Sequence, residues 1–481
     1  MNVLLVVSLL GKLLLVDSLL LVPPLLISLI DRTPDAGALG LTMIITAAVG
    51  ALMALVHPKD DTLRAREGFT IVALTWIAVS FLGGLPFYIS GYIPSMIDCF
   101  FETVSGFTTT GSTILTDVEA LPRGLLFWRS FTHWVGGMGV LVLSLALLPK
   151  LGSRSVFLMR AESPGPSPGK LVPRIGQTAK ILYAIYTGLS AFMFVVLLLC
   201  GMNWFDAFIH TVGAAGTGGF SNYNLSVGHF NSPLIETVIG VFLLLFGINF
   251  SIYFFLFRRN WREAFRNTEL RVYIGLVIAS VILIALNILP QYESLSEAFR
   301  YSFFQVATII TTAGFGTADF NLWPLFSKMI LFILMLTGCC AGSTGGGMKL
   351  IRLTMLFKGV KREIRRTVHP RGANIIRVDG RAVDEDIFAS VPLFFFCYFA
   401  VIILATLIVS LDNFDFESTF TAVVACISNI GPGFGKVGPT GNFSEFSGAS
   451  KLVLSVCMLL GRLELYPVLL LISRRTWLRH G

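Results

Sequence analysis

Four short glycine-bearing segments carry the residue types of an ion-binding site. They are Thr109-Thr110-Gly111-Ser112, Thr217-Gly218-Gly219-Phe220, Thr312-Ala313-Gly314-Phe315 and Gly431-Pro432-Gly433-Phe434, with third-position glycines 108, 95 and 119 residues apart. Glycine reaches backbone angles that let successive carbonyl groups point the same way, and the threonine hydroxyls add oxygen atoms. Rings of carbonyl oxygens replace the hydration shell of a cation in membrane filters. Oxygen ligands without a carboxylate suit a monovalent cation better than Ca²⁺ or Mg²⁺. We therefore predict that the four segments line one cation filter.

The same segments allow a simpler interpretation, in which glycine only permits tight turns between helices. A single such loop would favour that interpretation, whereas four loops at near-equal spacing favour the filter. The repeat is imperfect, because Ser112 stands where the other segments have Phe and Gly431-Pro432 replaces the Thr-x pair. The filter is therefore expected to be only approximately four-fold. The phenylalanines that end three segments are expected to pack outward and brace them: Phe220, Phe315 and Phe434.

A second candidate site is a run of small residues, Gly338-Cys-Cys-Ala-Gly-Ser-Thr-Gly-Gly-Gly-Met-Lys349. No stable helix passes through three consecutive glycines, so a membrane span is expected to break here. A phosphate-binding P-loop is excluded, because its motif would need Lys in place of Met348. A flexible break below the filter could act as a gate, and a static break is the alternative. The predicted gate residues in this run are Gly342, Ser343, Thr344, Gly345, Gly346, Gly347 and Lys349.

The last apolar stretch contains a charged residue, Arg462. A charge at mid-span costs about 2.5–3.5 kcal/mol on insertion scales, so such residues usually face a cavity or a partner. A fixed positive charge below a cation filter would raise the barrier to passing ions or hold a gate closed. We therefore add Arg462 to the predicted gate. In the alternative interpretation, Arg462 and Glu464 each pair with neighbouring helices, since residues two apart do not face each other on one helix.

Acidic residues stand at comparable places before the four segments: Asp98, Glu102, Asp206, Glu297 and Glu417. They could draw cations to the outer mouth of a pore. We favour helix capping for Asp98, Asp206 and Glu417, which fall near expected helix starts. The six histidines are scattered without metal-ligand spacing, and the seven cysteines show no disulfide or metal framework. No organic cofactor is therefore expected.

Composition indicates a polytopic membrane protein. Of 481 residues, 54% are hydrophobic and 13% are charged, whereas soluble chains average about 25% charged residues. A bilayer core is crossed by about 20 apolar residues. The first stretch is expected to be a retained membrane segment rather than a signal peptide. Ten stretches reach the required length, near 3–30, 37–57, 69–91, 126–148, 179–201, 233–257, 271–290, 325–350, 387–411 and 449–473.

Four shorter apolar segments, near 95–108, 203–215, 294–311 and 415–428, lead directly into the glycine segments. Segments of this length suit re-entrant helices. A unit of helix, pore helix, filter loop and helix thus occurs four times in parallel, after an N-terminal helix pair. The predicted fold is all-α, with ten transmembrane helices around one pore. Its predicted regions are the N-terminal pair 1–60 and the pore repeats 69–150, 178–260, 270–357 (with a broken second helix) and 385–476.

Basic residues concentrate in the segments 58–68, 149–180, 258–271, 349–381 and 474–481, which all fall on one side of a ten-span arrangement. That side is expected to be the cytoplasm, with both termini there and the four loops outside. The net charge of +8 is thus a topology signal, and no nucleic-acid partner is expected. The Pro/Gly-rich segment 160–174 is expected to be a cytoplasmic linker. The basic segment 358–381 is expected to bind anionic lipid or to dock a cytoplasmic partner.

Several of these motifs together resemble the bacterial TrkH/KtrB branch of the superfamily of K⁺ transporters. The resemblance covers nearly the whole chain, and the N-terminal pair, the length and the broken eighth span are more similar to TrkH. It rests on Phe107-Thr-Thr-Thr-Gly-Ser, Trp134-Val-Gly-Gly-Met-Gly, Thr312-Ala-Gly-Phe-Gly, Gly342-Ser-Thr-Gly-Gly-Gly-Met-Lys and Gly461-Arg-Leu-Glu.

The resemblance implies K⁺ uptake by a homodimer in the bacterial inner membrane, with one pore per subunit, and K⁺ bound at the filter. It also implies a cytoplasmic, nucleotide-binding regulatory partner with RCK domains, similar to TrkA. The family's intramembrane loop matches 338–349, and its pore arginine matches Arg462. Gly111 stands where Na⁺-transporting plant relatives have Ser, which favours K⁺, although the imperfect repeat implies imperfect discrimination against Na⁺. Transport could be channel-like or coupled to Na⁺ or H⁺.

Two other classes of function fit the sequence less well. A polytopic membrane enzyme would need a catalytic constellation inside the spans, and the sequence contains no H-E-x-x-H, intramembrane Asp pair or G-x-S-x-G. A secondary transporter of a small organic solute would be expected to show inverted repeats around one central site, whereas the predicted repeats run parallel. The sequence therefore favours an ion-conducting protein that is not an enzyme.

Overall fold

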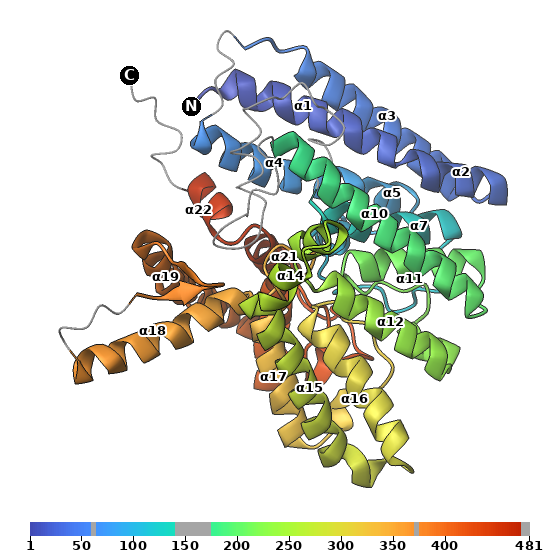
Figure 1. The fold of residues 1–481 in the computed structure, drawn as a ribbon. Coiled ribbons are helices and arrows are strands. Elements are labelled where there is room, and N and C mark those ends of the chain that lie inside the picture. The colour runs from blue at the N-terminus through green and yellow to red at the C-terminus, as the bar shows by residue number, and fades with distance from the viewer. Residues whose placement is uncertain (59–63, 140–174, 370–374, 473–481) are drawn as a thin grey trace.

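The computed structural model describes residues 1–58, 64–139, 175–369 and 375–472 (Figure 1). The regular structure of these residues is almost entirely helical. The predicted linker 160–174, the end of the predicted span 126–148 and the C-terminal basic segment 474–481 lie outside the described residues.

An N-terminal group of helices lies along one side of the molecule, consisting of α1 (Val3–Leu20), α2 (Val22–Asp31) and α3 (Asp35–Ala54) (Figure 1). Helices α1 and α3 cross closely at two glycines. A Cβ atom on Gly11 would lie 2.4 Å from the backbone nitrogen of Ala54, and one on Gly50 would lie 2.9 Å from the Gly11 carbonyl oxygen. Small residues at such a crossing allow tight packing between apolar helices.

Each of the four repeats begins with a long apolar helix. These first helices are α4 (Ala65–Gly83, continued by α5, Leu85–Ile89), α10 (Ile175–Leu199), α15 (Thr268–Ile288) and α19 (Glu385–Val409). Among the described residues, six helical stretches are long and apolar enough to cross a membrane, and one further pair of bent helices also qualifies. The stretches include all four first helices, α1–α2 and α3.

A shorter helix occupies each of the four segments that were predicted to precede the glycine loops. These are α6 (Met96–Phe107), α11 (Trp204–Ala215), α16 (Leu295–Ile310) and α20 (Phe416–Ser428). Each is capped by a polar side chain that accepts a hydrogen bond from a backbone N–H three residues later, which stabilises the helix start. The capping residues are Ser95, Asn203, Ser294 and Asp415.

The second helices of repeats two, three and four are all interrupted, whereas the sequence indicated a break only in repeat three. Repeat two bends by 89° between α12 (Pro233–Phe246) and α13 (Phe250–Phe257). Repeat three is interrupted by residues 338–349, between α17 (Leu325–Thr337) and α18 (Leu350–Val368), and repeat four between α21 (Gly448–Arg462) and α22 (Tyr466–Ile472). The described part of repeat one ends its second helix, α7 (Arg123–Gly137), at a similar place.

Smaller elements complete the described structure. The short helix α14 (Trp261–Arg266) connects repeats two and three, and strands β1 (Arg377–Val378) and β2 (Arg381–Ala382) form an antiparallel ribbon between repeats three and four. Short 3-10 turns cover Ser226–Phe230, Leu289–Gln291, Phe320–Leu322, Ser410–Asp412 and Gly435–Val437. Helix α18 and the ribbon project away from the helical bundle (Figure 1).

Candidate ion-conduction site

The glycine segments of the first three repeats lie against one another in order. A Cβ atom on Gly111 would lie 2.0 Å from the carbonyl oxygen of Gly218, and one on Gly219 would lie 1.9 Å from that of Ala313. No side chain fits at such a distance. Each glycine is therefore required by the close approach of the next repeat's backbone carbonyl.

The fourth segment closes these contacts into a ring. A Cβ atom on Gly314 would lie 2.1 Å from the carbonyl oxygen of Ile430. One on Gly431 would lie 2.9 Å from the carbonyl oxygen of Thr110, in the first repeat. Each repeat thus contacts the next one in the chain, and the fourth repeat contacts the first. Four segments that are far apart in sequence form one closed ring of backbone carbonyls.

The residue two positions before each ring glycine holds an unfavourable backbone conformation. Thr109, Thr217 and Thr312 have φ angles of 55°, 54° and 60°. A positive φ is rare for a β-branched residue and costs on the order of 1–3 kcal/mol. The same outlier at three equivalent positions indicates that the surrounding structure imposes it, which is typical of functional sites.

The fourth segment differs from the predicted register by two residues. Asn429, with φ of 55°, occupies the position of the three threonines. The next residue, Ile430, donates its N–H to the carbonyl five residues earlier, at 3.0 Å. Corresponding bonds in the other repeats join Thr110 to Ser105, Gly218 to Gly213 and Ala313 to Thr308.

The predicted assignment of Gly433 to the ring is therefore wrong, and Gly431 is the ring glycine, with φ of 94°. The predicted alignment was anchored on the Gly-Phe ending. In this segment Pro432 and Gly433 form an additional turn before Phe434, and the Gly433 N–H donates to the Val437 carbonyl at 2.7 Å. Asn tolerates positive φ better than other non-glycine residues, which explains its place here.

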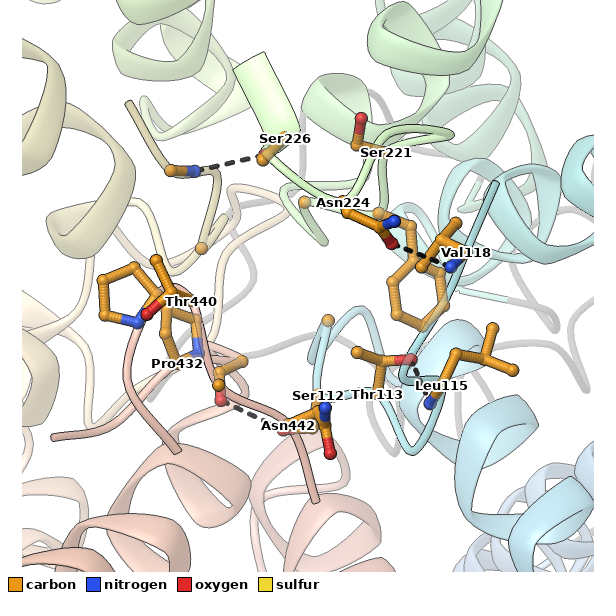
Figure 2. Close-up of a pocket in the computed structure, with 18 of the residues that line it drawn as sticks. Ser112, Thr113, Leu115, Val118, Ser221, Asn224, Ser226, Pro432, Thr440 and Asn442 are labelled. Atoms are coloured by element: carbon orange, nitrogen blue, oxygen red, sulfur yellow. Dashed lines mark hydrogen bonds between the residues drawn. The ribbon is translucent and has the colours of Figure 1, made fainter. Parts of the chain in front are cut away.

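The loops that follow the ring are also joined in a circle. A backbone N–H of one repeat donates to an acceptor in a neighbouring repeat at each junction: Val118 to Asn224 Oδ1 (2.8 Å), Gly316 to Ser226 Oγ (3.2 Å), Gly435 to Asn321 Oδ1 (3.0 Å) and Phe443 to the Thr113 carbonyl (2.8 Å). These loops surround a pocket of about 140 Å³, and all four ring glycines line it. Figure 2 shows the pocket between loops of repeats one, two and four.

The three phenylalanines after the ring are buried against the surrounding helices, as expected of residues that brace the loops. The Phe220 ring lies 4.1 Å from the His133 ring, and the Phe315 ring stacks on His210 at 5.7 Å. Phe434 packs edge-on against Phe320. The two histidines, to which the sequence assigned no role, form part of this packing.

Histidine 133 supports the ring in a second way. Its Nδ1 lies 2.7 Å from the Gly106 carbonyl oxygen, at the end of α6. A Cβ atom on Gly218 would lie 2.4 Å from the imidazole ring of His133. The His133 side chain therefore fills the space behind the second glycine segment and links it to α6.

A buried ion pair joins the loops of repeats one and two. Glu102 Oε1 lies 2.7 Å from Arg129 Nε, and both side chains are at most 3% exposed. Glu102 also accepts from the Ile114 N–H at 2.9 Å, while Arg129 donates to the Ser221 carbonyl at 3.1 Å and lies over Phe220. The carboxylate is thus engaged in the structure rather than free at the mouth.

The predicted capping by Asp98, Asp206 and Glu417 is wrong, because the caps are Ser95, Asn203 and Asp415. The three acids instead occupy first turns, where negative charge favours the helix dipole. Asp98 pairs with Lys451 at 2.7 Å, and Glu417 pairs with Lys328 at 2.8 Å. Each of these pairs joins two elements of the fold.

Asp206 accepts hydrogen bonds from the loop after the second segment. Its carboxylate binds Asn222 Nδ2 at 2.8 Å and the Tyr223 hydroxyl at 2.9 Å. Partial burial and the neighbouring Asp206 carboxylate raise the pKa of Tyr223 to about 12. The phenol therefore stays protonated and remains a donor. Glu297 lies in the first turn of α16 and is half-buried.

The glycine-rich run 338–349 lies directly against the ring. The Gly346 N–H donates to the hydroxyl of Thr312 at 2.6 Å, and the Gly347 N–H donates to the Ser428 carbonyl at 2.9 Å. These are the ring segments of repeats three and four. Gly342 and Gly347 have φ angles of 71° and 74°, so the run is an irregular loop rather than a helix.

Two basic side chains hold this loop. Arg462 donates to the carbonyls of Thr344 (2.8 Å) and Gly137 (2.6 Å), and approaches the Thr109 hydroxyl at 3.4 Å. It thereby connects the loop, the end of α7 and the first ring segment. Lys349 is buried and donates to the Gly345 carbonyl within the loop. Glu464 forms an ion pair at 2.5 Å with Arg352, which lies in the first turn of α18.

Both ends of the loop are bound by one carboxylate that the sequence did not reveal. Glu269 Oε1, at the start of α15, accepts from the N–H groups of Ala341 (2.8 Å) and Ile351 (3.0 Å). Its side chain is buried. In the sequence Glu269 stands among the arginines of the segment 258–271, and no local pattern indicates this long-range role.

Comparison with known proteins places the chain in context. Residues 38–477 match the family described as "TrkH: Cation transport protein". The Trk system potassium uptake protein TrkH of Escherichia coli strain K12 is 39% identical over 476 residues, covering 97% of this chain and 98% of that protein. The protein of the same name from Halomonas elongata is 37% identical over 485 residues, covering 99% and 100%.

The fold matches a solved structure from the same family. The crystal structure of the potassium transporter TrkH from Vibrio parahaemolyticus superposes with a TM-score of 0.89 at 35% identity, covering 99% of this chain and 100% of that one. The match confirms the predicted all-α polytopic fold and the prediction of a transporter rather than an enzyme. The chain belongs to the TrkH family of cation transport proteins.

Proposed function

We propose that this protein takes up K⁺ across the bacterial inner membrane through the ring formed by its four glycine segments. The closed order of contacts at Gly111, Gly219, Gly314 and Gly431 is the observation that carries the proposal. Its relatives are named potassium uptake proteins. The repeats 69–150, 178–260, 270–357 and 385–476 each contribute one quarter of the filter.

The chemistry of the ring supports a monovalent cation as substrate. Its ligands are oxygen atoms from backbone carbonyls and threonine hydroxyls, and the four ring segments contain no carboxylate. Divalent cations usually recruit Asp or Glu, whereas K⁺ is coordinated by carbonyl rings. The filter residues are Thr109, Thr110, Gly111, Thr217, Gly218, Gly219, Thr312, Ala313 and Gly314, with Asn429, Ile430 and Gly431 in the fourth repeat.

The loop 338–349 and Arg462 form the gate in this proposal. The loop lies against the ring through Gly346 and Gly347, and Arg462 holds Thr344 beside Thr109. Conduction then requires the loop to leave this position. The positive charge of Arg462 adds an electrostatic barrier to a cation on the same path.

Control of the gate is assigned to a cytoplasmic, nucleotide-binding partner with RCK domains, similar to TrkA. Helix α18 follows the loop directly and projects from the bundle (Figure 1). A partner bound to α18 would therefore act on the loop through one continuous element. The proposal also includes a homodimer with one pore per subunit and cytoplasmic termini.

The test is ion flux into proteoliposomes with purified wild-type protein, Gly314→Ser and Gly316→Ser. A Cβ atom at position 314 would lie 2.1 Å from the Ile430 carbonyl oxygen, whereas one at position 316 would have ordinary contacts at 3.7 Å. We expect Rb⁺ uptake selective over Na⁺ in wild type and in Gly316→Ser. Gly314→Ser should lose uptake or admit Na⁺.

Selective uptake that survives Gly314→Ser would contradict the filter assignment. If wild-type protein shows no flux, the same comparison is repeated with the regulatory partner added. Folded protein that carries no K⁺ under either condition would contradict the proposed function.

A further inference from the structure

An apolar cavity of about 530 Å³ opens between α12, α15 and α16. Cavities of about 300–1,000 Å³ typically hold small molecules. Its lining includes Val241, Ile274, Ile278, Ile282, Phe299 and Phe303. The hydroxyl of Tyr273, which also lines it, donates to the Leu244 carbonyl at 3.2 Å and so does not present a free polar group.

The open side of this cavity lies on an exposed apolar face of α15. Helix α15 is one of the apolar helices long enough to span a membrane. Ile274, Ile278 and Ile282 are 44%, 54% and 48% exposed and recur every fourth residue, so they line one face of α15. At 1.5 Å per residue this stripe is about 12 Å long. A trough of this shape suits a hydrocarbon chain that lies along the helix.

Positive charge collects at one end of the trough. Arg271 lies one turn before Ile274 on the same face of α15, is exposed and donates to the Arg266 carbonyl at 3.2 Å. Glu269 is turned inward to bind Ala341 and Ile351, so its charge does not offset this surface. The other exposed arginines of the connecting segment are Arg258, Arg259, Arg262 and Arg266.

Aromatic side chains mark the same end as a membrane boundary. Trp261 and Phe265 are 56% and 61% exposed, four residues apart on α14. Aromatic side chains are common at the headgroup level of membranes. Ala264 of α14 packs in one apolar cluster with Leu270 of α15 and with Ile248, which lines the cavity. The arginine-rich segment is therefore held at the end of the trough.

We propose that this cavity binds one acyl chain of an anionic phospholipid, with the headgroup phosphate against Arg271 and the exposed arginines of the segment 258–266. Guanidinium groups bind phosphate oxygens in a bidentate manner. Basic sites between transmembrane helices are known to select anionic headgroups. A zwitterionic phospholipid has the same acyl chains but no net charge, so it should bind more weakly.

The test is native mass spectrometry of the full-length protein, purified in detergent and titrated with phosphatidylglycerol or phosphatidylcholine of the same chain length. Ile278→Trp fills the trough, and Arg271→Glu reverses its charge. The matched controls are Ile403→Trp, at a 59% exposed position on α19, and Arg32→Glu, at an exposed arginine that ends α2. Wild type and both controls should bind several-fold more phosphatidylglycerol than phosphatidylcholine.

Both test variants should bind phosphatidylglycerol only as weakly as the wild-type protein binds phosphatidylcholine. Equal binding of the two lipids by wild type would overturn the proposal, as would unchanged phosphatidylglycerol binding by Arg271→Glu. A shift of Ile278→Trp from dimer to monomer with unchanged lipid per chain would assign the trough to a second copy and also overturn it. Arg271→Glu changes an exposed side chain, so it decides the matter even if Ile278→Trp fails to fold.

Discussion

The side chain of Asn429 attaches the fourth glycine segment to its neighbours in the ring. Its Nδ2 donates to the Thr110 hydroxyl and to the Met458 carbonyl, both at 2.9 Å. It thereby links repeat four to repeat one and to α21. Threonine fills the equivalent place in the other repeats. The longer amide side chain of Asn429 reaches both Thr110 and Met458, which the short hydroxyl of a threonine could not do.

We expect Asn429→Ala to lower the thermal stability and the K⁺ selectivity of the protein. The loss of two buried hydrogen bonds costs about 1–3 kcal/mol, and alanine must also hold φ near 55°. Asn429→Gly keeps the backbone angle and should recover part of the stability but not the selectivity. Unfolding temperature in detergent and Rb⁺ against Na⁺ flux measure the two effects.

Asn413→Ala is the control for this substitution. Asn413 also has a positive φ, 57°, but it is exposed and outside the ring. It should lose a small amount of stability and keep full selectivity. If Asn429→Ala behaves like Asn413→Ala, the interrepeat contacts of Asn429 have no role in the filter.

The buried pair of Glu102 and Arg129 is expected to dominate the local stability of the loops that follow the first two glycine segments. Glu102→Ala leaves the guanidinium buried without its carboxylate, which costs about 3–5 kcal/mol. Glu445→Ala removes the partner of Lys436 in a pair whose side chains are 48% and 65% exposed, and should cost at most about 1 kcal/mol. Thermal unfolding of the two variants in the same detergent compares them, and similar losses would contradict the structural role.

At the scale of elements, the interrupted second helices place irregular backbone below the ring. The loop 338–349 contacts α13, since the Phe250 N–H donates to the Gly342 carbonyl at 3.0 Å. It also contacts Gly247, in the bend of repeat two, through the Cys340 N–H at 3.2 Å. Irregular backbone at membrane depth is tolerated only inside protein or beside a water-filled cavity. The breaks of neighbouring repeats thus support one another.

Glu269→Ala is expected to raise the basal K⁺ flux. The carboxylate holds both ends of the loop through Ala341 and Ile351, so its removal frees the loop to leave the ring. Glu269→Gln keeps an acceptor oxygen without the charge and should give an intermediate flux. The control is Glu263→Ala on α14, an exposed carboxylate six residues earlier.

Rb⁺ uptake in proteoliposomes without the regulatory partner measures this effect. Folded Glu269→Ala protein with wild-type basal flux would show that the carboxylate does not hold the gate. Flux that rises equally in Glu263→Ala would instead indicate a general loosening of the region between α13 and α15.

At the scale of the molecule, the four repeats are joined twice, once through the ring and again through the loops that follow the ring. Either circle alone would fix the order of the repeats. Both circles are formed by residues that follow the short helices α6, α11, α16 and α20, whereas α18 follows the loop 338–349. The distribution of basic residues then predicts which face is outside.

This orientation is tested by cysteine labelling in intact cells, in a Cys200→Ser and Cys397→Ser background, because the other five cysteines are buried. Ala120→Cys, in an outer loop, should react with a membrane-impermeant maleimide. Lys361→Cys, on α18, should react only after the cells are made permeable. The opposite pattern would reverse the proposed topology.

The sequence determined the membrane character and the places of the four short helices before the glycine segments, because these depend on composition and on local patterns. Apolar length predicts a span, and a short amphipathic helix before a glycine loop is recognisable at each of four places. The shared Thr-x-Gly pattern and its spacing predict the equivalence of Gly111, Gly219 and Gly314, because the glycine is the third residue in each of these segments.

Only the tertiary structure decided the register of the fourth segment, the capping residues and the contacts of Glu269. The register depends on which glycine meets the Thr110 carbonyl, and that neighbour is 321 residues away. Glu269 binds N–H groups 72 and 82 residues further along the chain. Local patterns carry no information on such partners, because they are brought together only when the four repeats close into a ring.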